Sequence, residues 1–277
     1  MSVPRFALKI GYLPTPAYSG FSHQLHDPTN IFTKVVRALE KARLIQTYEN
    51  ISFASRTDRG VGALSQVISF NSSIIPILSE INSFLPLDIR VLAMVKVPDN
   101  FNPRHKAIMR TYSYLLVINE TFDFKKAMNV IDIFSGTHDF VNFAKIDREN
   151  KNNTVKTITS INLSRVNDYV VRINISSRSF LWQQVRRMIG HIINVATTDL
   201  SVESTQFLLL NHSIKQKPPS APAEPLILED IVYDQIQFEL NRKSVNFFRH
   251  HLIKEVTKYE ARLALHKLML DYLSSEN

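Results

Sequence analysis

Segments with the two-residue period of a β-strand alternate along this chain with segments spaced as amphipathic helices, and this alternation constrains the fold most strongly. Alternating apolar residues over positions 6–10 predict a first strand. The apolar residues of positions 31–44 share one helical face, and Thr29 or Asn30 is placed to cap that helix. Strands and helices in this order predict an α+β layer with helices on one face of a sheet.

The same two periods continue to the end of the chain. We predict further strands over residues 51–54, 67–70, 91–97, 109–118, 155–163, 169–176 and 226–233, and further helices over residues 73–84, 125–134 and 180–196. The tail after Glu239 is predicted to form one or two amphipathic basic helices. The second half repeats the plan of the first. We therefore expect an N-terminal half over residues 1–100, a C-terminal half over 101–240 and a helical extension over 241–277.

The charge balance indicates a polyanionic partner. The 277 residues carry 33 Lys and Arg against 25 Asp and Glu, a formal net charge of +8. Each phosphate that such a surface neutralises releases condensed counterions, which favours nucleic-acid binding. Many basic proteins bind no nucleic acid, so charge alone leaves both possibilities open.

Cysteine is absent from the sequence, which excludes disulfides, thiolate-bound zinc, iron–sulfur clusters and a cysteine nucleophile. The first residues alternate as a strand and contain no apolar signal core, and no later apolar run is long enough to cross a bilayer. We expect a soluble, cytoplasmic protein with no membrane association.

One loop combines a carboxylate, an arginine and two of the six glycines of the chain. Asp58 follows Arg56 by two residues and precedes Gly60 and Gly62. Glycines let a backbone turn sharply or approach a ligand closely, and a neighbouring arginine favours the ionised carboxylate. These residues alone fit either a catalytic loop or a surface turn with a local ion pair.

The run from Ser55 to Ala63 resembles the signature loop of the TruA-type tRNA pseudouridine synthases, Gly-Arg-Thr-Asp-Ala-Gly-Val-His-Ala. The Arg-Thr-Asp and Gly-Val cores are intact, whereas Ser55, Arg59 and Gly62 replace the family's Gly, Ala and His. These departures concern the choice of uridine rather than the reaction.

Five further segments resemble family motifs in the same order. They are Tyr18–Gln24, the Phe101–Tyr114 segment with Arg104, Ala107, Arg110 and Tyr112, Gly136–Phe143, Ser179–Gly190 and Ala221–Leu228. The resemblance covers the chain up to about residue 240.

The resemblance implies a role for each candidate site residue. Asp58 is the catalytic residue, acting as a covalent nucleophile or as a base. Arg186 is its ion-pair partner, and Tyr112 stacks on the target uracil. Substrate binding is further assigned to three residues, Arg56, Arg110 and Leu228, whereas Tyr114 is expected in the core.

The resemblance also implies the fold, the substrate and the oligomeric state of the enzyme. The expected fold is α+β, with two ferredoxin-like halves whose sheets join into one mainly antiparallel sheet, and with the active site in a basic cleft between them. The substrate is tRNA, on the 3′ side of the anticodon stem-loop. Neither a cofactor nor a metal takes part, and the bacterial members of the family imply a homodimer.

Two alternatives stay open beside this interpretation, and a third is disfavoured. The chain could act on other tRNA positions, or bind tRNA without chemistry; a metal-dependent nuclease lacks the clustered acidic ligands that it would need. His138 and Asp139 are adjacent, but two ligands without partners make a weak metal site. The basic residues of the tail fit phosphate contacts or a solvated face.

Overall fold

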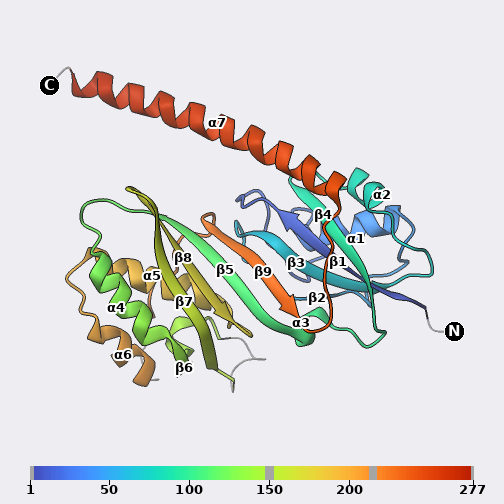
Figure 1. The fold of residues 1–277 in the computed structure, drawn as a ribbon, viewed down its shortest axis with the longest axis horizontal. Helices are drawn as coiled ribbons and strands as arrows, with labels where there is room; N and C mark the ends of the chain where they lie inside the picture. The colour runs from blue at the N-terminus through green and yellow to red at the C-terminus, as the bar shows by residue number, and fades with distance from the viewer. Residues whose placement is uncertain (1–2, 147–152, 212–216, 276–277) are drawn as a thin grey trace.

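A single mixed sheet of nine strands runs through the molecule (Figure 1). The computed structural model describes residues 3–146, 153–211 and 217–275. The strands are β1 (Arg5–Tyr12), β2 (Ser52–Phe53), β3 (Gly62–Asn71), β4 (Ile89–Val97), β5 (Ala107–Val117), β6 (Gly136–Asp139), β7 (Val155–Asn167), β8 (Val170–Ser177) and β9 (Leu226–Tyr233). Their order is β4-β1-β3-β9-β5-β8-β7-β6, with β2 paired to β3. The predicted α+β fold with one mainly antiparallel sheet is confirmed.

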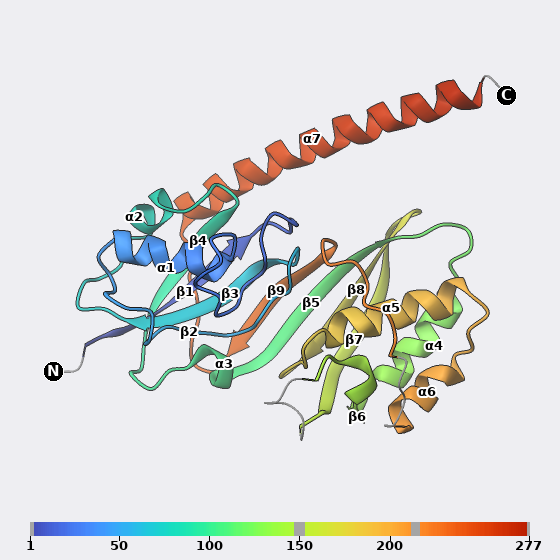
Figure 2. The ribbon, with the colours of Figure 1, turned by 180° about the vertical axis from the view of Figure 1, so that it is seen from behind.

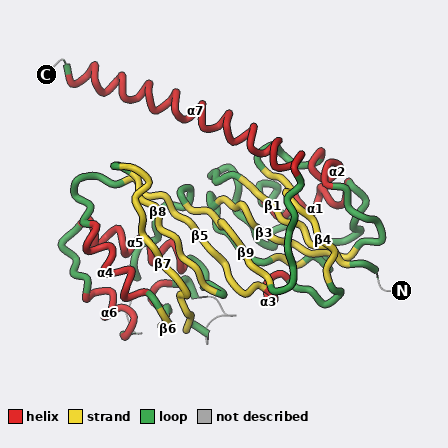
Figure 3. Tube along the Cα trace, viewed as in Figure 1, coloured by secondary structure: helices red, strands yellow, loops and turns green. Residues whose placement is uncertain are grey.

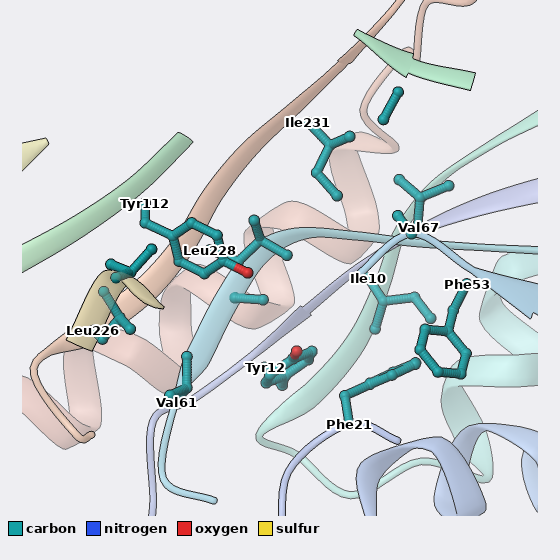
Figure 4. Close-up of a cluster of buried hydrophobic side chains, with 14 of the residues drawn as sticks. Ile10, Tyr12, Phe21, Phe53, Val61, Val67, Tyr112, Leu226, Leu228 and Ile231 are labelled. Carbon is teal, nitrogen blue, oxygen red and sulfur yellow. The ribbon is translucent and has the colours of Figure 1, made fainter. Parts of the chain in front are cut away.

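Strand β9 lies in the middle of this sheet and joins the strands on its two sides. It pairs antiparallel with β5 and parallel with β3, where Ala63 lies opposite Leu228. The chain thus returns from its C-terminal part to close the gap between strands of its two halves. Figure 4 shows the result, since Tyr112 of β5 and Leu228 of β9 meet in one buried cluster with Val61.

Helices pack on the face of the sheet that is turned to the viewer in Figure 2. They are α1 (Ile31–Lys41), α2 (Leu78–Ser83), α3 (Pro103–Lys106), α4 (Phe124–Phe134), a 3-10 turn η1 (Val141–Phe143), α5 (Gln184–Thr197) and α6 (Glu203–Leu210). Helix α1 is capped by the Asn30 side chain, which accepts a hydrogen bond from the Phe32 amide at 3.0 Å. One of the two predicted caps is thereby confirmed.

Two predicted helices are shorter in the structure. The helix predicted over 73–84 is restricted to α2, because Pro76 lacks an amide hydrogen and disfavours helical backbone before it. The helix predicted from residue 180 begins at Gln184, because Gln183 has a left-handed φ of 62°. Residues 180–183 therefore form a loop in front of α5.

The predicted helical tail is one helix, α7 (Arg242–Ser274). Figure 3 shows the segment after β9 crossing the N-terminal strands as a loop before α7 begins. The Asn241 amide donates to the Leu92 carbonyl at 2.8 Å, and Asn82 Nδ2 donates to Ser244 Oγ at 3.2 Å. These contacts attach the start of α7 to β4 and α2. Within the described part of the chain, none of the helices combines the length and apolar character that crossing a bilayer demands.

Candidate active site

Asp58 lies in the loop between β2 and β3, and a second loop holds the backbone beside it. Thr57 and Phe21 exchange backbone hydrogen bonds of 3.0 and 3.3 Å. Gly20 has a φ of +99°, and a Cβ there would lie 2.3 Å from the Thr57 carbonyl oxygen. Only glycine fits so close to this backbone. Two of the sequence motifs, around residues 20 and 58, thus form one structural unit.

Side-chain and backbone contacts fix the loop from its other side. The Thr57 hydroxyl and the buried Tyr12 hydroxyl share a hydrogen bond of 2.8 Å. The Val61 amide donates to the Asp58 carbonyl at 3.2 Å across a turn in which Gly60 has a φ of +85°. The position of the Asp58 backbone is therefore strongly determined before its side chain makes any contact.

The Asp58 carboxylate has a different donor on each oxygen. Arg186 Nη1 donates to Oδ2 at 2.9 Å, and Trp182 Nε1 donates to Oδ1 at 3.0 Å. Both ionic side chains keep some access to solvent, 21% for Asp58 and 18% for Arg186. The predicted ion pair is present, and charge-assisted hydrogen bonds of this length orient a carboxylate firmly.

Arg186 is itself held by the loop before β9. Its Nε donates to the Ala221 carbonyl at 2.8 Å, and the Ala221 amide donates to the Arg186 carbonyl at 2.9 Å. A Cβ on Gly190, one turn later in α5, would lie 2.1 Å from the Pro219 carbonyl oxygen. The loop therefore lies directly on α5, which leaves the Arg186 guanidinium aimed at Asp58.

Trp182 is a site residue that sequence reasoning missed. It lies in the loop in front of α5, and Lys145 Nζ lies 4.2 Å from the centre of its ring. The Lys145 amide also donates to the Trp182 carbonyl at 2.9 Å. This is the only tryptophan of the chain and it stands inside a recognised motif, but nothing in the sequence shows that its N–H meets Asp58.

Tyr112 lies beside the same loop. Only 7% of its surface is exposed, and its hydroxyl shares a 3.0 Å hydrogen bond with Ser55 Oγ. The centres of the Tyr112 and Phe180 rings are 5.4 Å apart, and the two rings are nearly perpendicular. Burial raises the pKa of the Tyr112 hydroxyl above its usual value. Ser55 replaces the glycine of the family pattern, so its hydroxyl adds a contact that glycine could not make.

These residues surround a cavity of about 550 Å³. Among the described residues that line it, Asp58 is the only carboxylate, whereas six side chains are cationic: Arg56, Arg104, Arg110, Lys156, Arg178 and Arg186. A pocket with this charge pattern attracts an anionic ligand such as a nucleic-acid backbone.

The remaining predicted residues lie in different places. Arg56 is exposed at the cavity wall. Arg110 is buried and donates to the carbonyls of Ala54 and Arg104 at 2.9 and 2.8 Å, and to that of Arg178. Leu228 has no exposed surface, and Leu226 takes the place on the cavity wall that was expected of Leu228. Direct substrate contact by Arg110 or Leu228 stays a prediction.

The chain is similar to known proteins over nearly its whole length. It is 36% identical to the tRNA pseudouridine synthase A of Thermococcus gammatolerans over 94% of this chain and 97% of the relative, and 33% identical to that of Methanobrevibacter smithii over 97% of both. A family model described as tRNA pseudouridine synthase matches residues 130–234. The chain belongs to the tRNA pseudouridine synthase family. The solved structure titled "Crystal Structure of a Cbf5-Nop10-Gar1 Complex" is similar at a TM-score of 0.36 and 11% identity, covering 68% of this chain and 45% of that one. This likeness is slight, and the assignment rests on the sequence relatives.

Acidic and histidine side chains do not cluster as metal ligands in the described ranges, where no group of three or more His, Asp or Glu is placed to hold an ion. His138 Nε2 instead makes a 2.8 Å contact with the Ser135 carbonyl, and Asp139 Oδ1 accepts from the Val141 amide at 3.0 Å. The His-Asp element of this pseudouridine synthase thus makes local structural contacts.

Proposed function

We propose that this member of the family isomerises uridine to pseudouridine in tRNA, with the Asp58 carboxylate as the catalytic group. The surroundings and hydrogen bonds of that carboxylate support this most. It is the one acid among the described residues of a basic cavity, and each of its oxygens accepts a hydrogen bond from a fixed donor.

The reaction rearranges bonds within one nucleotide. The bond between N1 and C1′ breaks, C5 bonds to C1′, and the hydrogen displaced from C5 is balanced by one gained at N1. The overall change is neither an oxidation nor a hydrolysis. An ionised carboxylate serves it as a nucleophile that holds the sugar or uracil while the base turns, or as a base that removes a proton from the sugar. Arg186 and Trp182 hold the Asp58 carboxylate in one orientation in either route.

Tyr112 and the cations of the cavity complete the proposal. A uridine must leave its stack to reach Asp58, and an aromatic wall offers it a replacement surface. The Tyr112 and Phe180 rings supply that wall. Arg56, Arg104, Lys156 and Arg178 are placed to meet the phosphates on either side of the extruded nucleotide. Arg110 donates hydrogen bonds to the carbonyls of Ala54 and Arg104, and its role is to position the cavity wall.

The finer features rest on the family resemblance. We propose a uridine on the 3′ side of the anticodon stem-loop as the target, a homodimer as the working form and the cytoplasm as the location. Arg59 supports a distinct choice of uridine, since its Nε donates to the Pro16 carbonyl at 3.0 Å where the family has alanine.

Asp58→Asn tests the proposal, because the amide preserves the shape of the side chain but cannot act as a carboxylate. Unmodified tRNA transcripts are incubated with each protein, and pseudouridine is mapped by carbodiimide-blocked primer extension. We expect the wild type to form pseudouridine and Asp58→Asn to form none. Asp168→Asn, on the exposed turn between β7 and β8, is the matched control and keeps full activity.

The outcomes separate the alternatives. Full activity of Asp58→Asn contradicts the assignment of the residue. Wild-type binding without product identifies a tRNA-binding module, and product outside the anticodon stem-loop identifies a different target site.

A further inference from the structure

The segment of residues 136–143 carries one of the sequence motifs but has no part in the function proposed so far. It forms β6 and η1, and the chain after η1 leads directly to Lys145. Phe140 and Phe143 have no exposed surface. No residue of 136–144, all of which the structure describes, lines the cavity around Asp58. Any contribution of this segment to the reaction therefore comes through a residue next to it.

The end of the segment is firmly held. Asn142 is 1% exposed, and its Nδ2 donates to the Asn211 carbonyl at 2.7 Å and to a second carbonyl in α6 at the same distance. Lys217 Nζ donates to the Ala144 carbonyl at 2.9 Å. Buried polar groups with all these partners have little freedom to move. The backbone that precedes Lys145 is therefore fixed from two sides.

Lys145 contacts Trp182 twice. Its amide donates to the Trp182 carbonyl at 2.9 Å, and its Nζ lies 4.2 Å from the centre of the indole ring. The face of an aromatic ring is negative, so it attracts an ammonium group at this distance. The first contact fixes the backbone of the loop before α5, and the second fixes the orientation of the ring.

The Trp182 ring depends on such a contact. It is 41% exposed, and an exposed side chain ordinarily changes rotamer within picoseconds to nanoseconds. The 3.0 Å hydrogen bond from its Nε1 to Asp58 Oδ1 forms only when the ring has one orientation, because hydrogen bonds weaken steeply as they bend. A cation on the ring face holds that orientation.

We propose that Lys145 is a positioning residue for the reaction, which keeps the Trp182 N–H on Asp58. The inference rests on the proposed function of Asp58. The ammonium group also draws electron density from the indole and makes its N–H a stronger donor. The segment of residues 136–143 thereby gains a role, since it places Lys145 over the ring.

The fluorescence of the free protein tests the contact, because Trp182 is the only tryptophan of the chain. Lys145→Ala removes the ammonium group but keeps the backbone hydrogen bond. The anisotropy of the wild type is expected to decay only with overall tumbling, whereas Lys145→Ala should add a component faster than a few nanoseconds. Lys145→Arg keeps a cation on the ring and should behave as the wild type. Lys125→Ala, at an exposed lysine of α4, is the matched control and should also behave as the wild type.

Single-turnover rates test the consequence for catalysis. Lys145→Ala is expected to slow pseudouridine formation by about threefold to tenfold, with the Kd for tRNA unchanged. Lys145→Arg should stay within about twofold of the wild type, and Lys125→Ala should match it. In a Trp182→Phe background, Lys145→Ala should cause no further loss, because the N–H through which it acts is already absent.

Three results overturn the proposal. They are a wild-type anisotropy decay in Lys145→Ala, an equal loss of rate in the two backgrounds, and weaker tRNA binding by Lys145→Ala with an unchanged rate. The last would identify Lys145 as a phosphate contact instead. A wild type that forms no pseudouridine would refute the proposed function and the catalytic role of Lys145 with it. The anisotropy is measured without substrate, so it distinguishes that failure from the absence of a contact between Lys145 and the ring.

Discussion

Helices α5 and α7 differ in how much of each is determined by the rest of the chain. Most of α5 is buried, including Val185, Met188, Ile189 and Ile192, whereas α7 buries Ser244 and Phe248. A helix packed on many sides has a single position, so it can hold Arg186 to within hydrogen-bonding tolerance. A helix packed at one end leaves its free surface available to a partner. The comparison predicts that substitutions in α5 change chemistry and stability, while substitutions in the exposed part of α7 change neither.

The largest effect is expected for Arg186→Met, which leaves the Asp58 carboxylate without its ionic partner. A catalytic group that is no longer held in its reactive position reacts about a hundredfold or more slowly, so we expect the rate to fall by about a hundredfold to a thousandfold. The measurement is the single-turnover rate of pseudouridine formation at saturating enzyme. Arg249→Met in α7 is the control, since Arg249 is exposed, and it is expected to retain the wild-type rate. Similar losses in both variants would refute the comparison.

His191 tests whether α5 also determines stability. Its side chain is 2% exposed, contacts Thr205 Oγ1 at 2.9 Å, and burial lowers its pKa to about 4. The unfolded chain takes up a proton near pH 6.5 that the folded chain excludes, so stability is lost as the pH falls from about 6.5 to about 4.

The expected loss is about 3 kcal/mol over that interval. Urea unfolding of the wild type and of His191→Gln at several pH values measures it. The glutamine variant cannot take up the proton and should lose about 3 kcal/mol less than the wild type over the same pH range. Parallel curves for the two proteins would show that His191 does not titrate on unfolding.

Trp182→Phe keeps an aromatic face for Lys145 but removes the N–H that meets Asp58. A hydrogen bond to a charged group contributes about 2 kcal/mol, so we expect a loss of about thirtyfold in the single-turnover rate, with tRNA affinity unchanged. Phe207→Leu, at an exposed aromatic of α6, is the control. Weaker tRNA binding with an unchanged rate would show that Trp182 serves the substrate rather than Asp58.

Local patterns predicted much of the fold. Strand β9 has the predicted bounds, and the predicted β7–β8 hairpin is present, with its turn at Asp168 and Tyr169, one residue later than expected. Both depend on residue period and turn chemistry, which lie within a few positions of each other in the chain. The predicted start of helix α5, residue 180, is too early. Gln183 has a left-handed backbone that no local sequence preference indicates, and this backbone places Trp182 in the loop before the helix.

Contacts between distant residues could not be read from the sequence. Ser55, in the loop after β2, shares a hydrogen bond with Tyr112 of β5, and Trp182 reaches Asp58 from the loop before α5. The ion pair of Arg186 with Asp58 was expected only because the motifs resembled a family. Period and composition carry no information about which loops meet, since that depends on the insertion of β9 between β3 and β5.

The smallest effect is expected from removing residues 256–277. The anchors Ser244 and Phe248 stay in place, and the deleted stretch is exposed wherever the structure describes it. We expect the single-turnover rate to stay within about twofold, and the free energy of unfolding at low protein concentration to change by less than about 0.5 kcal/mol. A large loss of activity at saturating enzyme would mean that α7 contributes to catalysis, and the distinction between the two helices would fail.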